Sequence, residues 1–222
     1  MSPLHHAPDE LLMAYAAGGL GEAQSLALAT HLALCLVCRG EVRRLETLGG
    51  VLLDDLPAPP VDEDLLTAFL NRLDAPGGEV ATLSRSCAKP AAAGLPVLPQ
   101  PLRGYVGGDL DQVAWTRILP GLAQATVPVR SGTARARLLR VAAGTALPRH
   151  THAGTELTLV LSGGYSDGDR HFQRGDLDFC DGSVDHRPMA GESGECVCLL
   201  VTDAPLRLTG PTGRLLNSFL RL

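Results

Sequence analysis

Residues 75–101 divide the chain into two parts with different patterns of apolar residues. The stretch contains APGG, KPAAAGLP and LPQP, and it has no apolar periodicity. Closely spaced prolines and glycines interrupt helices and central strands, so a core element cannot continue through it. The length of 222 residues also exceeds the commonest domain size of about 100–150 residues. The sequence therefore predicts two domains, residues 1–85 and 102–222, joined by a linker at residues 86–101.

The first part has the pattern of four helices. Its segments are rich in alanine and leucine, and they end at helix stop signals such as Gly18-Gly19 and the prolines of LPAPP. The last segment, DEDLLTAFLNRLD, begins with acidic residues and carries apolar residues at spacings of three and four. We expect a small all-α bundle with a fourth, amphipathic helix beyond a hinge. The predicted helices are 9–17, 22–34, about 39–53 and 62–74.

The second part has the pattern of short strands. Its apolar segments are VAWTRIL, ARARLLRV, ELTLVLSGGY, DLDFC and CVCLLV, and glycine-bearing turns separate them. Short strands at regular intervals are typical of an antiparallel sandwich or barrel. The predicted fold class is therefore α + β with two domains, an all-α bundle followed by an all-β barrel.

Composition limits the compartment. No apolar run approaches the roughly 20 residues needed to cross a bilayer, and MSPLHHAPDE lacks a basic flank followed by an apolar segment. We therefore expect a cytoplasmic protein without a membrane partner. Thiols stay reduced there, so the six cysteines are interpreted as metal ligands, redox sensors or small core residues rather than a disulfide framework.

Charge is distributed unevenly along the chain. Residues 1–85 carry 12 acidic and 5 basic side chains, a balance of −7, whereas residues 86–222 carry 12 and 14, a balance of +2. Nucleic acid binding depends on basic groups that neutralise phosphates, so the acidic helical part argues against it. An acidic surface favours a basic protein partner instead.

Three metal-capable side chains lie in the apolar run HLALCLVC. His31, Cys35 and Cys38 share one face if a helix continues through them, and the cysteines lie beside the helix end if it stops at Leu34. A structural zinc site needs four nitrogen or sulfur ligands, and the nearest further donors are the adjacent His5 and His6. The residues alone leave the choice between these two histidines open. Zinc would stabilise a helical unit too small for a large core.

A second group of metal-capable residues lies in GTALPRHTHAGTELTLVLSG, residues 144–163. This stretch is similar to the first motif of the cupins, G-x5-HxH-x3-E-x6-G, at every fixed position. His150 and His152 alternate to the same side of a strand, and Glu156 follows on the next strand. All three are therefore expected to face the interior of a cupin barrel, a double-stranded β-helix.

The resemblance to cupins implies a fourth ligand, His186, which follows Gly175 at the spacing of the second motif. Asp181, Ser183 and Ala190 stand where that motif has proline, glycine and asparagine, so its turn chemistry differs here. The three histidines and one glutamate are harder ligands than the first group. They suit zinc, manganese, iron or nickel, and the sequence does not choose among these metals.

The N-terminal stretch HHAPDELLMAYAAGGLGEAQSLALATHLALCLVC resembles the start of the ChrR-type zinc-binding anti-sigma factors. The resemblance continues into the cupin part, through TELTLVL, ECVCLLV and VTDAPLRLTG. It implies that His6, rather than His5, completes a zinc site with His31, Cys35 and Cys38.

The same resemblance implies a function. Residues 1–85 would bind and inhibit an extracytoplasmic-function (RpoE-type) sigma factor, and the cupin would be required for its release after singlet oxygen or related oxidative stress. The chain would then be a regulator and not an enzyme.

A metal-dependent cupin enzyme of the dioxygenase or isomerase type, fused to a zinc-binding interaction domain, is the alternative. Fold and ligands alone do not establish chemistry, and no further acid, base or substrate-binding cluster stands out. Cys196 and Cys198 are expected to face the same side of a strand, where either burial or redox sensing would account for them. Cys87 and Cys180 have no evident partner, and His171 fits no ligand position.

Overall fold

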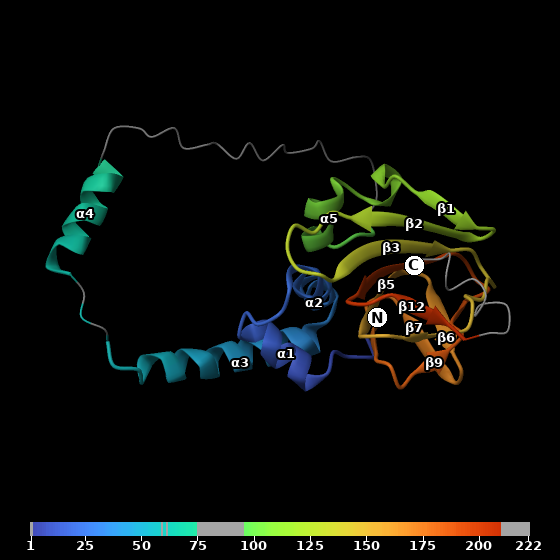
Figure 1. Ribbon diagram of the computed structural model, residues 1–222, viewed down its shortest axis with the longest axis horizontal. Coiled ribbons are helices and arrows are strands. Elements are labelled where there is room, and N and C mark those ends of the chain that lie inside the picture. The colour runs from blue at the N-terminus through green and yellow to red at the C-terminus, as the bar shows by residue number, and fades with distance from the viewer. Residues whose placement is uncertain (1, 59, 61, 75–95, 210–222) are drawn as a thin grey trace. The chain divides into compact units, whose positions relative to one another are not determined.

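The computed structural model describes residues 2–58, 60, 62–74 and 96–209, and its chain forms two compact units (Figure 1). One unit contains residues 1–49 and 96–222, and the other contains residues 50–95. The first 49 residues therefore belong to the same compact unit as the barrel, whereas the helix at Glu63–Asp74 belongs to the other unit. The predicted domain limits at residues 85 and 102 do not coincide with this division, and they remain a prediction.

The first three helices follow one another closely. Helix α1 (Asp9–Ala16) ends before Gly18, whose positive φ of 69° suits glycine. Helix α2 (Glu22–Leu34) stops at Cys35, whose backbone is extended, and α3 (Leu36–Asp54) starts at the next residue at an angle of 118°. The third helix was predicted to begin near Arg39, and it begins three residues earlier because the break is confined to Cys35.

Helix α4 (Glu63–Asp74) agrees with the fourth predicted helix. Residues 75–95 lie outside the described residues, and so does most of the predicted linker. The end of that linker is ordered: Leu98 is fully buried, and helix α5 (Gln100–Val106) begins behind Pro99. A 3₁₀ turn, η1 (Leu110–Gln112), follows.

Within residues 96–209, which the structure describes, the barrel contains three antiparallel sheets. The six-stranded sheet has the order β1-β2-β3-β11-β5-β8, and two three-stranded sheets have the orders β10-β6-β7 and β12-β4-β9. The strands are β1 (Thr116–Leu119), β2 (Leu122–Val127), β3 (Arg135–Val141), β4 (His150–His152), β5 (Glu156–Ser162), β6 (Gly164–Asp167), β7 (Arg170–Gln173), β8 (Leu177–Cys180), β9 (Asp185–His186), β10 (Met189–Ala190), β11 (Cys196–Thr202) and β12 (Leu206–Leu208).

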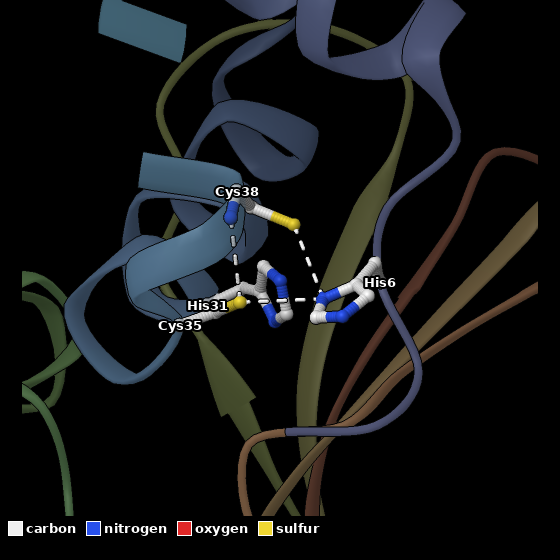
Figure 2. A group of neighbouring side chains, drawn as sticks. All are labelled: His6, His31, Cys35 and Cys38. Atoms are coloured by element: carbon white, nitrogen blue, oxygen red, sulfur yellow. Dashed lines mark hydrogen bonds between the residues drawn. The ribbon is translucent and has the colours of Figure 1, made fainter. Parts of the chain in front are cut away.

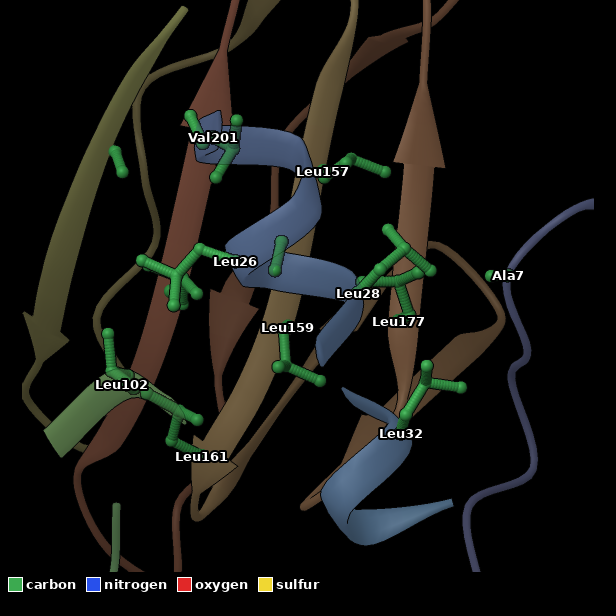
Figure 3. Packing of buried hydrophobic residues seen from close by; sticks show 14 of the residues in the cluster. Ala7, Leu26, Leu28, Leu32, Leu102, Leu157, Leu159, Leu161, Leu177 and Val201 are labelled. Carbon is green, nitrogen blue, oxygen red and sulfur yellow. The ribbon is translucent and has the colours of Figure 1, made fainter. Parts of the chain in front are cut away.

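Helix α2 covers one face of the six-stranded sheet (Figure 3). Its apolar residues, among them Leu26, Leu28 and Leu32, form one buried cluster with alternate residues of β5 and β11, such as Leu159 and Leu199. The other alternate residues of these strands face the barrel interior, where they form a second buried cluster. Strands buried on both faces are apolar throughout, and this explains the continuous run CVCLLV in β11.

Among the residues that the structure describes, no single helix is long and apolar enough to span a bilayer. Of the described helices, only the bent pair α2 and α3 reaches that length and hydropathy when the two helices are taken together.

Candidate metal sites

The break between α2 and α3 places four potential ligands around one point (Figure 2). His31 comes from the last turn of α2, Cys35 from the break, and Cys38 from the first turn of α3, while His6 approaches from the N-terminal tail. The ligand atoms of all four lie within 4.8 Å of one another. His6 Nδ1 is 3.3 Å from Cys35 Sγ and 3.5 Å from Cys38 Sγ. A zinc tetrahedron with standard bond lengths separates nitrogen and sulfur by about 3.5 Å.

The contacts of these four residues fit a bound zinc ion. His31 is fully buried and donates its Nδ1–H to the Gly175 carbonyl at 2.8 Å, so its Nε2 lone pair faces the cluster, without a hydrogen-bond partner among the residues that the structure describes. Burial lowers the pKa of His31, which keeps the imidazole neutral. Burial also raises the pKa of the Cys38 thiol to about 11, so a cation is needed to hold it as thiolate at neutral pH.

His5 lies outside this cluster. Its ring packs against Phe172 of β7 at a centroid distance of 4.3 Å, and its Nε2–H donates to the His171 carbonyl at 3.0 Å. The two adjacent histidines therefore have different environments, one on the barrel surface and one beside the thiols. Of the pair that the residues alone left open, the structure places His6 with His31, Cys35 and Cys38.

The second group meets inside the barrel. His150 and His152 come from β4, Glu156 from the start of β5 and His186 from β9, and all four are buried. The Nε2 atom of His186 is 3.0 Å from Nε2 of His150 and 3.1 Å from Nε2 of His152. The pairing of β4 with β9, which sets His150 opposite His186, produces this approach.

Hydrogen bonds fix two of these imidazoles with Nε2 facing inward. His150 donates its Nδ1–H to the Pro148 carbonyl at 2.7 Å, and His186 donates its Nδ1–H to Asp167 Oδ2 at 3.0 Å. Burial lowers the pKa of His150 and lowers the pKa of His152 to about 4. Neutral nitrogen lone pairs that approach within 3.1 Å of one another require a shared proton or a cation.

Glu156 adds the only acidic ligand of this group. Burial raises the pKa of its carboxyl to about 7, and its Oε2 atom has no hydrogen-bond partner among the described residues. The nearby His152 Nδ1 also lacks a partner there, at 3.6 Å from Glu156 Oε2. A buried carboxylate beside three inward-facing imidazoles has the ligand chemistry of a divalent transition metal.

A cavity of about 70 Å³ adjoins the barrel ligands. Its walls are mostly apolar, and they include Tyr165 and the two thiols of β11. Cys196 and Cys198 face the same side of β11, as their spacing predicts, and this side is the barrel interior. Their sulfur atoms are 3.5 Å apart. The hydrogen bond from Cys198 lowers the pKa of Cys196. The five cysteines that the structure describes are free thiols.

Sequence reasoning missed several acidic residues that support the two clusters. Asp167 orients His186, and Arg170 bridges Asp167 to Asp178 with bonds of 2.9 and 3.0 Å. Asp176 binds the backbone of the N-terminal tail. The order R-x-F-x-R-x-D-x-D resembles any polar strand pair, so spacing alone gives no signal for these roles.

Asp181 and Ser183 replace the proline and glycine expected in the second cupin motif. Asp181 Oδ1 accepts bonds from the Ser183 N–H at 2.9 Å and from its hydroxyl at 2.6 Å. This side-chain turn replaces the turn that proline and glycine form in the motif, and it keeps His186 in the ligand position. Ala190, in place of asparagine, is buried in the barrel interior.

The fold and the two clusters define a class of protein, a cupin barrel with a His/Cys cluster on N-terminal helices. The family model described as the ChrR cupin-like domain matches residues 104–205. The anti-sigma-E factor ChrR of Cereibacter sphaeroides is 40% identical over 224 residues, and the match covers 100% of each chain. This chain belongs to the ChrR family of anti-sigma factors, as the sequence resemblance predicts.

One solved structure agrees with this assignment. A chain in the crystal structure of Rhodobacter sphaeroides SigE in complex with the anti-sigma ChrR is 39% identical, with a TM-score of 0.76. The match covers 90% of this chain and 98% of that one. A cupin protein of Ralstonia eutropha is also similar, at 18% identity and a TM-score of 0.42 over 47% of this chain and 72% of that chain. The predicted fold class, N-terminal helices followed by a cupin, is confirmed.

Proposed function

We propose that this chain binds and inhibits an extracytoplasmic-function sigma factor in the cytoplasm. The observation that carries the proposal is the match to ChrR over the whole chain, together with the crystal structure in which ChrR is bound to SigE. We further propose that singlet oxygen or related oxidative stress causes release, and that the barrel is required for the response. The chain then acts as a regulator, and neither catalysis nor direct nucleic acid binding is part of its role.

Two apolar helical faces support a protein partner. The C-terminal half of α3 exposes Leu48, Val51, Leu52 and Leu53 by more than half of their surface. Helix α4 exposes five large apolar side chains by 48–66%: Leu65, Leu66, Phe69, Leu70 and Leu73. Groups of large apolar side chains that are exposed together mark surfaces that another protein covers. The acidic balance of residues 1–85 complements a basic partner.

We assign zinc to His6, His31, Cys35 and Cys38. Two thiolates and two neutral imidazoles give a closed site without net charge once Zn²⁺ is bound. Zinc would cross-link the N-terminal tail to both helices, which shapes the surface offered to the sigma factor. We assign a second divalent ion, which is zinc, manganese, iron or nickel, to His150, His152, Glu156 and His186.

The first test measures zinc content and sigma-factor binding in the same samples. Cys35→Ala or Cys38→Ala is expected to lose both together, because either change leaves only three ligands. Cys180→Ala is the matched control, since Cys180 is equally buried but lies in β8 outside the thiol cluster. A Cys35→Ala, Cys38→Ala double variant that copurifies with a sigma factor at full stoichiometry would contradict the proposal.

The second test separates inhibition from response. His150→Ala is expected to retain sigma-factor binding but to blunt stress-induced, sigma-dependent transcription. His171→Ala is the control, because this exposed histidine on β7 lies outside the ligand set. Unaltered induction in the His150→Ala variant would remove the barrel metal from the response.

A further inference from the structure

We propose that the turn between β7 and β8 holds the N-terminal metal site closed, and that Asp176 in this turn is a positioning residue for that site. The inference rests on the proposed zinc site at His6, His31, Cys35 and Cys38. It concerns how the barrel controls that site, beyond the assignment of its ligands.

Asp176 binds the segment that carries His6. Its side chain is only 2% exposed, and Oδ1 accepts the backbone N–H groups of Leu4 at 2.6 Å and His5 at 3.0 Å. Its Oδ2 accepts the N–H of Gln173 within the turn at 2.8 Å, so one carboxylate joins the tail to the barrel. The Leu177 N–H donates to the His5 carbonyl at 3.2 Å. The backbone immediately before His6 is therefore fixed to the barrel.

Gly175 contacts the helix that carries His31. Its carbonyl accepts the Nδ1–H of His31 at 2.8 Å, which sets the tautomer and orientation of the ligand. A Cβ atom at Gly175 would lie 2.8 Å from Pro3 Cγ and 3.5 Å from Leu34 Cβ, and its φ is +95°. Only glycine allows the turn to approach both the tail and α2 this closely. Two neighbouring residues of one barrel turn thus position two of the four ligands.

The same turn is bonded to the barrel core. Gly175 donates its N–H to the Val160 carbonyl at 2.8 Å, and the Val160 N–H donates to the Asp176 carbonyl at 3.0 Å. The Val160 side chain belongs to the buried cluster inside the barrel. Phe172, which packs against His5, also stacks on Tyr165 in the cavity wall at a centroid distance of 4.7 Å. A change inside the barrel can therefore reach the N-terminal ligands through directly bonded neighbours.

The test compares zinc release from full-length protein that has been loaded with Zn²⁺. Asp176→Ala is expected to release the N-terminal zinc to a chromophoric chelator faster, by about the 10–100-fold that loss of a ligand-supporting residue typically costs in metal affinity. Asp109→Ala is the matched control, because Asp109 likewise accepts two backbone N–H groups, but those of Val97 and Leu98 rather than those of the N-terminal tail. Its release rate is expected to equal that of the wild type.

A second measurement distinguishes positioning from general damage to the barrel. In cobalt-substituted protein, only a site with cysteine ligands gives thiolate-to-metal charge-transfer absorption. Asp176→Ala is expected to weaken this band while the barrel metal is retained. If Asp176→Ala does not fold, His5→Ala removes the contacts of the tail with Phe172 and the His171 carbonyl without removing a bond of the turn. It is expected to show the same change in rate and spectrum.

Two results would overturn the inference. Release at the wild-type rate from the Asp176→Ala protein, with hydrogen exchange at Leu4 and His5 accelerated, would show that freeing the tail does not affect the ligands. Equal loss of the N-terminal metal and the barrel metal from the Asp176→Ala protein would show that Asp176 has a merely structural role. By contrast, wild-type protein that binds no zinc at the thiols would overturn the zinc assignment of the proposed function, and this inference with it.

Discussion

Glu156 illustrates how one side chain can give the barrel a pH dependence. Burial raises its pKa to about 7 in the folded, metal-free protein, whereas an unfolded chain has a glutamate pKa of about 4.3. The folded state therefore binds the proton more tightly, and its contribution to the free energy of unfolding falls as pH rises between these values. A bound metal removes this effect because it holds the carboxylate ionised.

Glu156→Gln is expected to stabilise the metal-free protein at pH 8 by about 3 kcal/mol, with little effect at pH 4, since it removes the cost of ionising a buried carboxyl. Denaturant unfolding in the presence of a chelator measures the difference between the two proteins at each pH. Subtracting the curves cancels His150 and His152, whose lowered pKa values oppose folding as pH falls below about 6.5. A difference in the free energy of unfolding that stays constant between pH 4 and pH 8 would contradict the raised pKa of Glu156.

Helix α2 is the element that joins the two parts of the chain, because it carries His31 and covers the six-stranded sheet. Leu28→Ala is expected to cost about 2–5 kcal/mol, since the side chain is fully buried against the sheet. Helices and barrel should unfold in one cooperative transition and lose the same stability. Far-UV and near-UV circular dichroism measure this transition. Leu52→Ala in α3 is the control, and at 61% exposure it should change stability by less than about 0.5 kcal/mol. Separate transitions would argue against this joint core.

Local patterns predicted the elements better than their contacts. Stop signals and apolar spacing located α1, α2 and α4 because these depend on nearby residues. The same reasoning grouped the ligands of each cluster, since their spacing is local apart from His6 and His186. It missed the contact of α2 with β5 and β11, and it missed the roles of Asp167 and Asp176. Those depend on residues distant in sequence, and no single-sequence pattern specifies which surfaces meet.

At the scale of the whole molecule, the barrel supports helices that a metal alone would otherwise hold together. The apolar face of α2 is buried against β5 and β11, and the tail that carries His6 is bonded to Asp176. A fragment of residues 1–85 loses both supports. It would expose Leu26, Leu28 and Leu32 to solvent, which lowers its stability at about 25 cal/mol per Å² of exposed apolar area.

The fragment should therefore depend on zinc for its fold, whereas the full chain should not. We expect chelation to unfold residues 1–85, because zinc then provides the main connection between tail and helices. The full-length protein is expected to lose the same zinc and keep its helical circular dichroism, since α2 stays packed on the sheet. Circular dichroism of both proteins during titration with a chelator measures the contrast. A fragment that keeps its helical signal after complete zinc removal would show that the barrel is not needed to support these helices.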